Sequence, residues 1–216
     1  YDPLYTLQFT PAELRVAVEA AADYGTYVCT HVYNVPGIRR AVEAGVKSIE
    51  HGHLADEPTI AMLADREIWL SMQPFAAHDH SLPDHDRATK NQTVADGTAQ
   101  VYQWARKHGV KLGWGTDLLF EPDRNHRQSD MVVRLGEYFT NVEALKMVTS
   151  GNAALFRLSG ERDPYREARL GEITVGAWAD LLLINGDPTR DLGVLADPDT
   201  SLALIVKDGV VVKNTG

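Results

Sequence analysis

Ser48-Ile49-Glu50-His51-Gly52-His53 is a short stretch that ends on possible metal ligands, and two other stretches share its design. These are Tyr27-Val28-Cys29-Thr30-His31 and Lys111-Leu112-Gly113-Trp114-Gly115-Thr116-Asp117, and helix-forming segments separate the three along the chain. Short apolar runs that alternate with helices are typical of buried strands in a parallel sheet. The carboxyl ends of such strands meet at one edge. We therefore expect the terminal side chains of the three stretches to lie close together.

Capping signals predict where the intervening helices begin. Thr10 with Glu13 predicts a helix to about Tyr24, and Asp56 predicts one to about Asp65. Thr140 with Glu143 begins a helix that runs to about residue 158, with a break near Gly151. The remaining predicted elements are helices 36–44, 93–107 and 129–139, a strand 68–72 and a long loop 75–90. Four strand–helix units in succession predict an α/β region over residues 1–160.

The character of the chain changes after residue 160. We predict strands at Leu170–Gly176 and Ala179–Ile184, followed by a hairpin in which Asp208-Gly209 makes the turn between 202–207 and 210–213. Residues 161–216 are therefore expected to form a separate, small β region.

Composition narrows the classes of function. The net charge of −9 argues against nucleic acid as a partner, because phosphate binding requires clustered Lys and Arg. No stretch approaches the roughly 20 apolar residues of a membrane span. The first residues contain no recognisable signal peptide, which slightly favours a cytoplasmic location, although Tyr1 is not an initiator methionine. The single cysteine, Cys29, is expected to be a packed thiol on a buried strand.

Several motifs, in order along the chain, make it resemble the carboxyl-terminal half of the amidohydrolase superfamily, in the branch of imidazolonepropionase-like and Xaa-Pro or Xaa-Arg dipeptidase-like enzymes. The matching stretches are Thr30-His31-Val32-Tyr33, Ile49-Glu50-His51-Gly52, Gly115-Thr116-Asp117, Thr149-Ser150-Gly151-Asn152-Ala153-Ala154, Leu170-Gly171-Glu172-Ile173, Gly176-Ala177-Trp178-Ala179-Asp180-Leu181 and Lys207-Asp208-Gly209. One departure is Ala153, where many members have proline.

The resemblance implies the second half of a (β/α)8 TIM barrel, strands 5–8, followed by a small β-sandwich region. It also implies that His31 and His51 are metal ligands from the fifth and sixth barrel strands, and that Asp117 is a ligand and the catalytic residue from the eighth. The His-x-His of the first strand and the carboxylated lysine of the fourth strand have no counterpart here. An amino-terminal half, in the same or a separate chain, is therefore an expected partner.

The function that the resemblance implies is metal-dependent hydrolysis of C–N bonds of the amide, peptide, urea or carbamate type. The cofactor is a divalent metal, one or two ions, with zinc expected from the imidazole ligands. The substrate would be a small molecule or dipeptide-like, the protein a homo-oligomer, and this chain alone inactive. The alternative is a non-catalytic amidohydrolase-like scaffold or assembly subunit that has lost its metal.

Other residues are candidates for contacts near the site. Tyr33 is a substrate-binding candidate because a tyrosine at this place contacts the substrate carboxylate in the dipeptidase-like relatives that the chain resembles. Gln73, at the end of the next strand, and His53, expected in a loop near the mouth, are further substrate-binding candidates. His78-Asp79-His80 has His-x-His spacing but follows the wrong strand and is expected to be a polar loop.

Overall fold

The computed structural model of the chain describes residues 3–77, 84–118 and 122–216. The chain forms two compact units, Tyr1–Gly115 with Leu158–Arg162 and Thr116–Arg157 with Asp163–Gly216. The first unit contains a four-stranded sheet and the second a three-stranded sheet. Among the described residues, no helix is long and apolar enough to cross a membrane. The predicted domain boundary between residues 160 and 161 stays a prediction.

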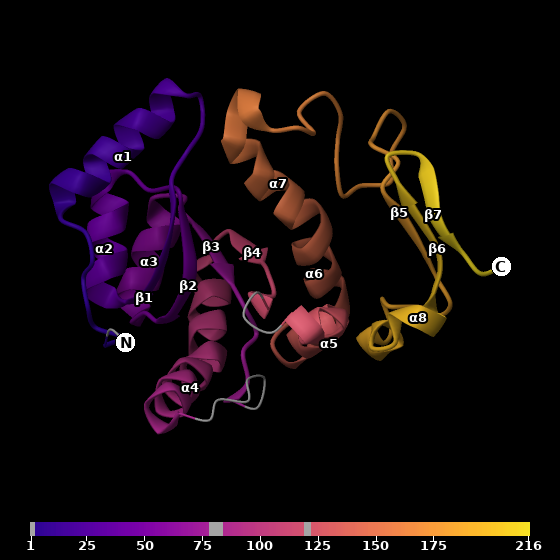
Figure 1. Cartoon of the computed structure of the whole chain (residues 1–216), viewed down its shortest axis with the longest axis horizontal. Coiled ribbons are helices and arrows are strands. Elements are labelled where there is room, and N and C mark those ends of the chain that lie inside the picture. The colour runs from indigo at the N-terminus through magenta and orange to yellow at the C-terminus, as the bar shows by residue number, and fades with distance from the viewer. Residues whose placement is uncertain (1–2, 78–83, 119–121) are drawn as a thin grey trace. The chain divides into compact units, whose positions relative to one another are not determined.

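The first unit is built on a parallel sheet whose strands lie side by side in sequence order (Figure 1). The strands are β1 (Cys29–Asn34), β2 (Ser48–Leu54), β3 (Trp69–Met72) and β4 (Leu112–Trp114). The helices are α1 (Pro11–Asp23) before the sheet and α2 (Val35–Ala44), α3 (Glu57–Asp65) and α4 (His85–His108) between successive strands. The α/β class with a parallel sheet is therefore confirmed.

The helices begin where the capping residues predicted. The Thr10 hydroxyl accepts the Glu13 amide N–H at 3.3 Å, and the Glu13 carboxylate accepts the Thr10 amide N–H at 2.8 Å. The Asp56 carboxylate accepts the Thr59 amide N–H at 2.9 Å and thereby caps α3. These bonds satisfy amide groups that have no partner within the helix.

The core of the first unit lies between the sheet and its connecting helices. Its completely buried apolar side chains are Ile38, Val46, Ile49, Ile60, Leu63, Leu70, Met72 and Ala105. All four residues of β3 are buried. A central strand of a parallel sheet is covered on both faces, so β3 is mostly apolar, with Ser71 as its one polar residue.

The edge strand β1 differs from this pattern. None of its residues is buried, and Cys29 is exposed. The prediction of a packed Cys29 thiol on a buried strand was therefore wrong. The reason is position in the sheet, because β1 has a neighbouring strand on one side only among the described residues.

Helix α4 begins earlier than expected. The predicted loop 75–90 was wrong at its end, because α4 starts at His85 and Asp84 caps it by accepting the Arg87 amide N–H at 3.0 Å. Polar composition had suggested a loop, but it also suits a helix with one solvated face. His78-Asp79-His80 lies outside the described residues.

The second unit combines short helices with a small antiparallel sheet. The helices are α5 (Gln128–Arg134), α6 (Asn141–Lys146), α7 (Asn152–Phe156) and α8 (Pro198–Ser201), and a π-helical turn, Met147–Gly151, joins α6 to α7 at the expected break. The sheet has the order β5 (Leu181–Ile184), β6 (Leu202–Lys207) and β7 (Val210–Asn214). Asp208 and Gly209 have φ of 51° and 73°, as a type I′ hairpin turn requires.

One predicted strand is absent from the second unit. Residues Leu170–Gly176 form bends and a turn instead, with Gly171 at a φ of 73°. A side chain at Gly171 would meet the Thr149 backbone at 2.6 Å, so this segment approaches the π-helical turn closely. The left-handed backbone at Gly171 interrupts the extended conformation that the apolar alternation predicted.

Candidate functional site

Four polar side chains gather at the ends of neighbouring parallel strands in the first unit. His31 is the third residue of β1, His51 and His53 belong to β2, and Gln73 directly follows β3. The prediction that strands end at His31 and Asp117 was wrong in detail, since β1 continues to Asn34 and β4 ends at Trp114.

His31 and His51 are brought together as the sequence predicted. Nδ1 of His31 lies 2.8 Å from Nε2 of His51, and the two ring centroids are 4.9 Å apart. His51 is 3% exposed, whereas His31 is exposed. The His51 ring is therefore shielded from solvent, whereas His31 is accessible to it.

The backbone at His51 is unusual. His51 and Gly52 have φ of 79° and 68°, in the left-handed region that few non-glycine residues adopt. The pairing of β1 with β2 shifts register opposite this point, between Val32 and Asn34. Residues held in such conformations cluster at functional sites, because the surrounding structure must impose them.

Gln73 joins the two histidines of β2. Its side-chain oxygen lies 2.8 Å from Nδ1 of His51, and its main-chain carbonyl accepts a hydrogen bond from Nε2 of His53 at 2.9 Å. Gln73 is 4% exposed. Its predicted role as a substrate contact stays a prediction, while the structure gives its amide oxygen a partner within the protein.

His53 is a strand residue, and the expectation of a loop position was wrong. It is 1% exposed and its ring stacks on Phe75, with centroids 5.1 Å apart. Burial lowers the pKa of His53 to about 3, because the charged imidazolium would lose its hydration. Nδ1 of His53 is buried and has no hydrogen-bond partner among the described residues. A neutral imidazole that donates from Nε2 carries its lone pair on this nitrogen.

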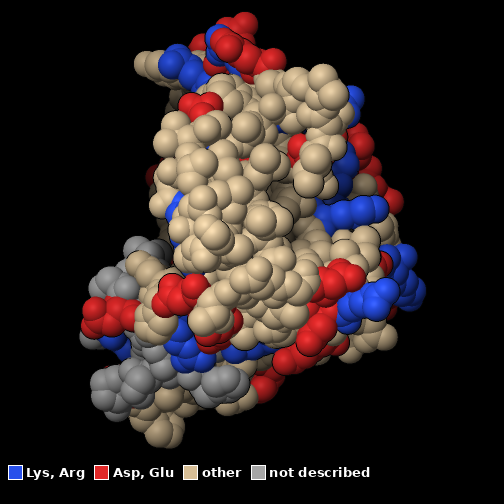
Figure 2. All heavy atoms as spheres, turned by 90° about the vertical axis from the view of Figure 1, so that its right-hand side faces the viewer, with Lys and Arg blue, Asp and Glu red and all other residues tan. Residues whose placement is uncertain are grey.

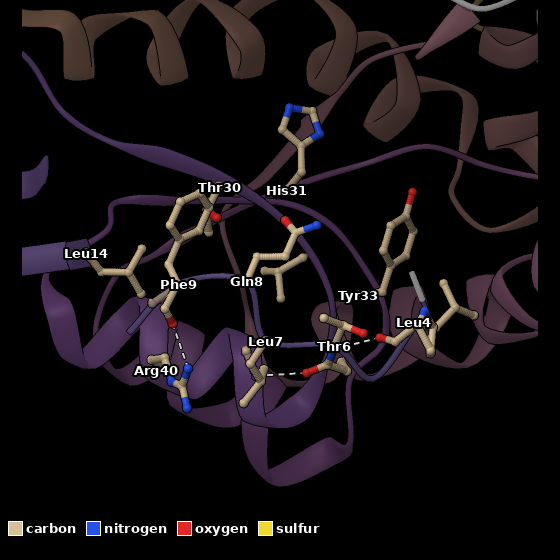
Figure 3. Close-up of a pocket in the computed structure, with 15 residues that line it drawn as sticks. Leu4, Thr6, Leu7, Gln8, Phe9, Leu14, Thr30, His31, Tyr33 and Arg40 are labelled. Atoms are coloured by element: carbon tan, nitrogen blue, oxygen red, sulfur yellow. Dashed lines mark hydrogen bonds between the residues drawn. The ribbon is translucent and has the colours of Figure 1, made fainter. Parts of the chain in front are cut away.

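Tyr33 stacks on His51, with ring centroids 4.6 Å apart and an interplanar angle of 7°. Figure 3 shows Tyr33 and His31 projecting in the same direction from β1, as residues two apart on a strand do. The two also line a cavity of about 320 Å³ between residues 3–9, β1 and α2. Arg40 of α2 closes part of this cavity by donating to the Phe9 carbonyl at 2.6 Å.

Asp117 follows the last residue of β4 by three positions and has a φ of 54°. It belongs to the second compact unit, so its convergence with His31 and His51 stays a prediction. Among the described residues, no group of three or more His, Cys, Asp or Glu side chains is placed to hold a metal ion.

Sequence reasoning missed Gly97 of α4. A Cβ on this residue would lie 2.0 Å from the main-chain oxygen of His53, so only glycine lets α4 pack at this point. The available signal was a glycine inside a helical segment, which usually has a packing reason.

Comparison with known proteins identifies the family. The chain matches the amidohydrolase family over residues 3–213. Ochratoxinase of Aspergillus niger is 31% identical over 214 residues, which are 97% of this chain but only 42% of that protein.

Solved structures agree with this match. A prolidase complexed with N-methylphosphonate-L-proline shares 30% identity and superimposes with a TM-score of 0.86 over 99% of this chain and 51% of its own. A Xaa-Pro dipeptidase with methionine bound in its active site shares 27% identity, with a TM-score of 0.81 over 96% and 50% of the two chains. This chain belongs to the amidohydrolase family, as its motifs indicated, and spans about half the length of these relatives.

Proposed function

We propose that this chain contributes part of the site of a metal-dependent hydrolase of C–N bonds. The observation that carries the proposal is the pair of facing ring nitrogens, Nδ1 of His31 and Nε2 of His51, in a chain of the amidohydrolase family. The two nitrogens lie 2.8 Å apart, at hydrogen-bond distance, and a divalent ion would take the place of the hydrogen between them, because neutral imidazole is a common ligand of zinc and similar ions. His31 and His51 would hold a divalent metal, expected to be zinc, with one or two ions in the complete site.

The missing ligands define what else the site needs. Two histidines alone leave most positions of a metal open, and structural or catalytic zinc sites use at least three protein ligands. We propose that an upstream half, in the same or a separate chain, supplies the others, and that Asp117 joins them.

We also propose a fold for the whole protein, based on the family to which the chain belongs. β1–β4 would be strands 5–8 of a (β/α)8 barrel, and β5–β7 would be part of a β-sandwich. Figure 2 views the second unit from the side of β7 and shows a broad area with few charged side chains. Exposed apolar residues of this sheet include Leu182, Leu183, Val210, Val211 and Val212. An apolar surface of this kind supports a covering layer in the complete protein.

The proposed reaction adds water across an amide-type bond. When bound, the metal lowers the pKa of a water molecule and polarises a carbonyl group. Asp117 accepts a proton from the attacking water and passes it to the leaving nitrogen as the C–N bond breaks. The products are a carboxylic acid, which carries the oxygen of the water, and an amine, whose nitrogen carries the transferred proton.

The relatives point to a substrate class. The solved relatives include a prolidase and a Xaa-Pro dipeptidase, so we propose a dipeptide-like amide as substrate. Tyr33, stacked beside His51, is placed to contact it, and His53 and Gln73 are further candidate contacts at the same strand ends.

The test uses the full-length polypeptide that contains this chain. Its metal content is measured, and hydrolysis is assayed with Xaa-Pro dipeptides and N-acyl amino acids. We expect bound zinc and turnover, and we expect Asp117→Asn to lower kcat by about 10²–10⁴-fold while most metal stays bound. The exposed Asp199 provides a control, Asp199→Asn, with unchanged turnover.

Two results would contradict the proposal. A full-length protein that holds no metal and cleaves no amide would favour the alternative, a scaffold that has lost its metal. Full activity in the Asp117→Asn variant would remove Asp117 from proton transfer.

A further inference from the structure

We infer that Gln73 is a positioning residue that keeps the single proton of His51 on Nδ1 and so presents the lone pair of Nε2 toward His31. Its significance for metal binding rests on the proposed function. The position of the His51 proton, in contrast, is inferred from contacts of His51 with Gln73 and His31, which all lie in the first unit.

Gln73 Oε1 and His51 Nδ1 lie 2.8 Å apart and form a hydrogen bond. An amide oxygen is an acceptor only, so the hydrogen in this bond must come from the imidazole. A neutral imidazole carries one N–H, and its other nitrogen then holds a lone pair. Nε2 of His51, the nitrogen that faces His31, is therefore left unprotonated.

This is the form that a ligand requires. A histidine binds metal through an unprotonated nitrogen, and the hydrogen bond made by the other nitrogen sets which one is available. A Gln73 amide turned by 180° would donate to Nδ1 instead. That orientation would move the proton to Nε2 and block the nitrogen that points at His31.

Hydrogen bonds from α4 fix the main chain on both sides of Gln73. The Tyr102 hydroxyl of α4 donates to the Met72 carbonyl at 3.0 Å, and the Thr98 hydroxyl donates to the Phe75 carbonyl at 3.3 Å. Both side chains are 1% exposed. The main-chain oxygen of Gln73 itself accepts from His53. Helix α4 and His53 thus fix the short segment from which the amide reaches His51.

The proton is observed directly by NMR. Selective ¹⁵N labelling of histidine in the full-length polypeptide, without metal, gives long-range ¹H–¹⁵N patterns that distinguish Nδ1–H from Nε2–H. The His51 signal is assigned by its loss in His51→Asn. We expect the Nδ1–H pattern in the wild-type protein, and an Nε2–H pattern would overturn the inference.

Two substitutions separate the acceptor from the packing. Gln73→Glu keeps an acceptor oxygen, so it should retain the Nδ1–H pattern and a zinc affinity within a few-fold of wild type. Gln73→Met has similar length but puts a methyl group in place of the acceptor oxygen, and its sulfur is only a weak acceptor, so the Nε2–H form should gain population. Its zinc affinity should fall by about 10–100-fold, as for other residues that orient a metal-binding histidine.

A matched control tests whether any disturbance near β3 has the same effect. Thr98→Val removes the hydrogen bond to Phe75 but leaves the partner of His51 unchanged. It should alter the melting temperature without changing the His51 pattern. A purely structural role for Gln73 is indicated, and the inference overturned, if Gln73→Met also keeps the Nδ1–H pattern and the wild-type zinc affinity.

Failure of the proposed function is recognised separately. A wild-type protein that shows Nδ1–H on His51 but binds no zinc would contradict the metal site and leave the Gln73 assignment intact. A protein that binds zinc with the proton on Nε2 in its metal-free form would contradict the assignment and leave the metal site intact.

Discussion

The two sheets of this chain use similar apolar residues but bury them to different extents. Leu70 of the parallel sheet is completely buried, whereas Leu182 and Leu183 of the antiparallel sheet are 57% and 60% exposed. The difference lies in the connections. Each crossover between the parallel strands brings a helix onto the sheet, whereas the β6–β7 hairpin brings no covering element and β5 and β6 are joined by short helical turns only. The parallel sheet therefore comes with covering helices, whereas Leu182 and Leu183 of the small sheet stay exposed in this chain.

The largest expected contrast concerns acid stability, because the parallel sheet contains the buried His53. In the unfolded chain the His53 ring binds a proton near its ordinary pKa of 6.5. In the folded chain burial lowers this pKa to about 3. Between these two pH values the unfolded state binds a proton that the folded state does not. The free energy of unfolding therefore falls as the pH is lowered from 6.5. The loss attributable to His53 should approach about 4 kcal/mol near pH 3.

Urea unfolding of the chain in chelator, from pH 7 to pH 4, measures this effect. His53→Gln should show a flatter dependence on pH than the wild-type chain. His126, an exposed histidine of the second unit, provides the control: His126→Gln should keep the wild-type slope. Equal slopes for the His53→Gln variant and the wild type would show that burial does not hold this ring neutral.

The second contrast applies the same substitution to both sheets. Leu70→Ala leaves a cavity in a closed core and should lower the free energy of unfolding by about 3 kcal/mol. Leu182→Ala removes an exposed side chain and should cost less than about 1 kcal/mol in this chain. Chemical denaturation of both variants gives the two values.

The comparison becomes sharper in the full-length polypeptide. If a covering layer packs on β5–β7 there, Leu182→Ala should cost more than it does in the isolated chain, while the cost of Leu70→Ala should be unchanged. An equal cost of Leu182→Ala in the two polypeptides would argue against such a layer.

The smallest contrast concerns two helical glycines. Gly97→Ala puts a methyl group 2.0 Å from the main-chain oxygen of His53, so α4 must move, at a cost of about 2 kcal/mol. Gly136→Ala meets only ordinary contacts, the nearest at 3.4 Å from Leu192, and should be neutral or slightly stabilising. Thermal melting of the two variants tests this, and similar melting temperatures would mean that α4 accommodates the methyl group.

Much of the fold could be predicted from local sequence. The capping boxes at Thr10 and Thr140 mark helix starts, and Asp208-Gly209 marks a hairpin turn, because each signal acts over a few residues. The pairing of His31 with His51 also followed from sequence, since residues at the ends of neighbouring parallel strands share one edge.

Other features could not be predicted in this way. The exposure of Cys29 depends on which strand lies at the edge of the sheet. The early start of α4 depends on a polar segment that suits either a loop or a solvated helix. The position of Gln73 near a strand end could be predicted from the sequence, but the partner of its side-chain amide, His51, could not.

The sequence by itself determined the family, the parallel α/β class and the two histidines that face one another, because these depend on periodicity, caps and ordered motifs. Only the tertiary structure decided which polar atoms meet: the Gln73 amide with His51, its carbonyl with His53, and Gly97 beneath that strand end. Such contacts join residues 20 or more positions apart, and their geometry is set by how α4 packs on the sheet, which no local pattern encodes.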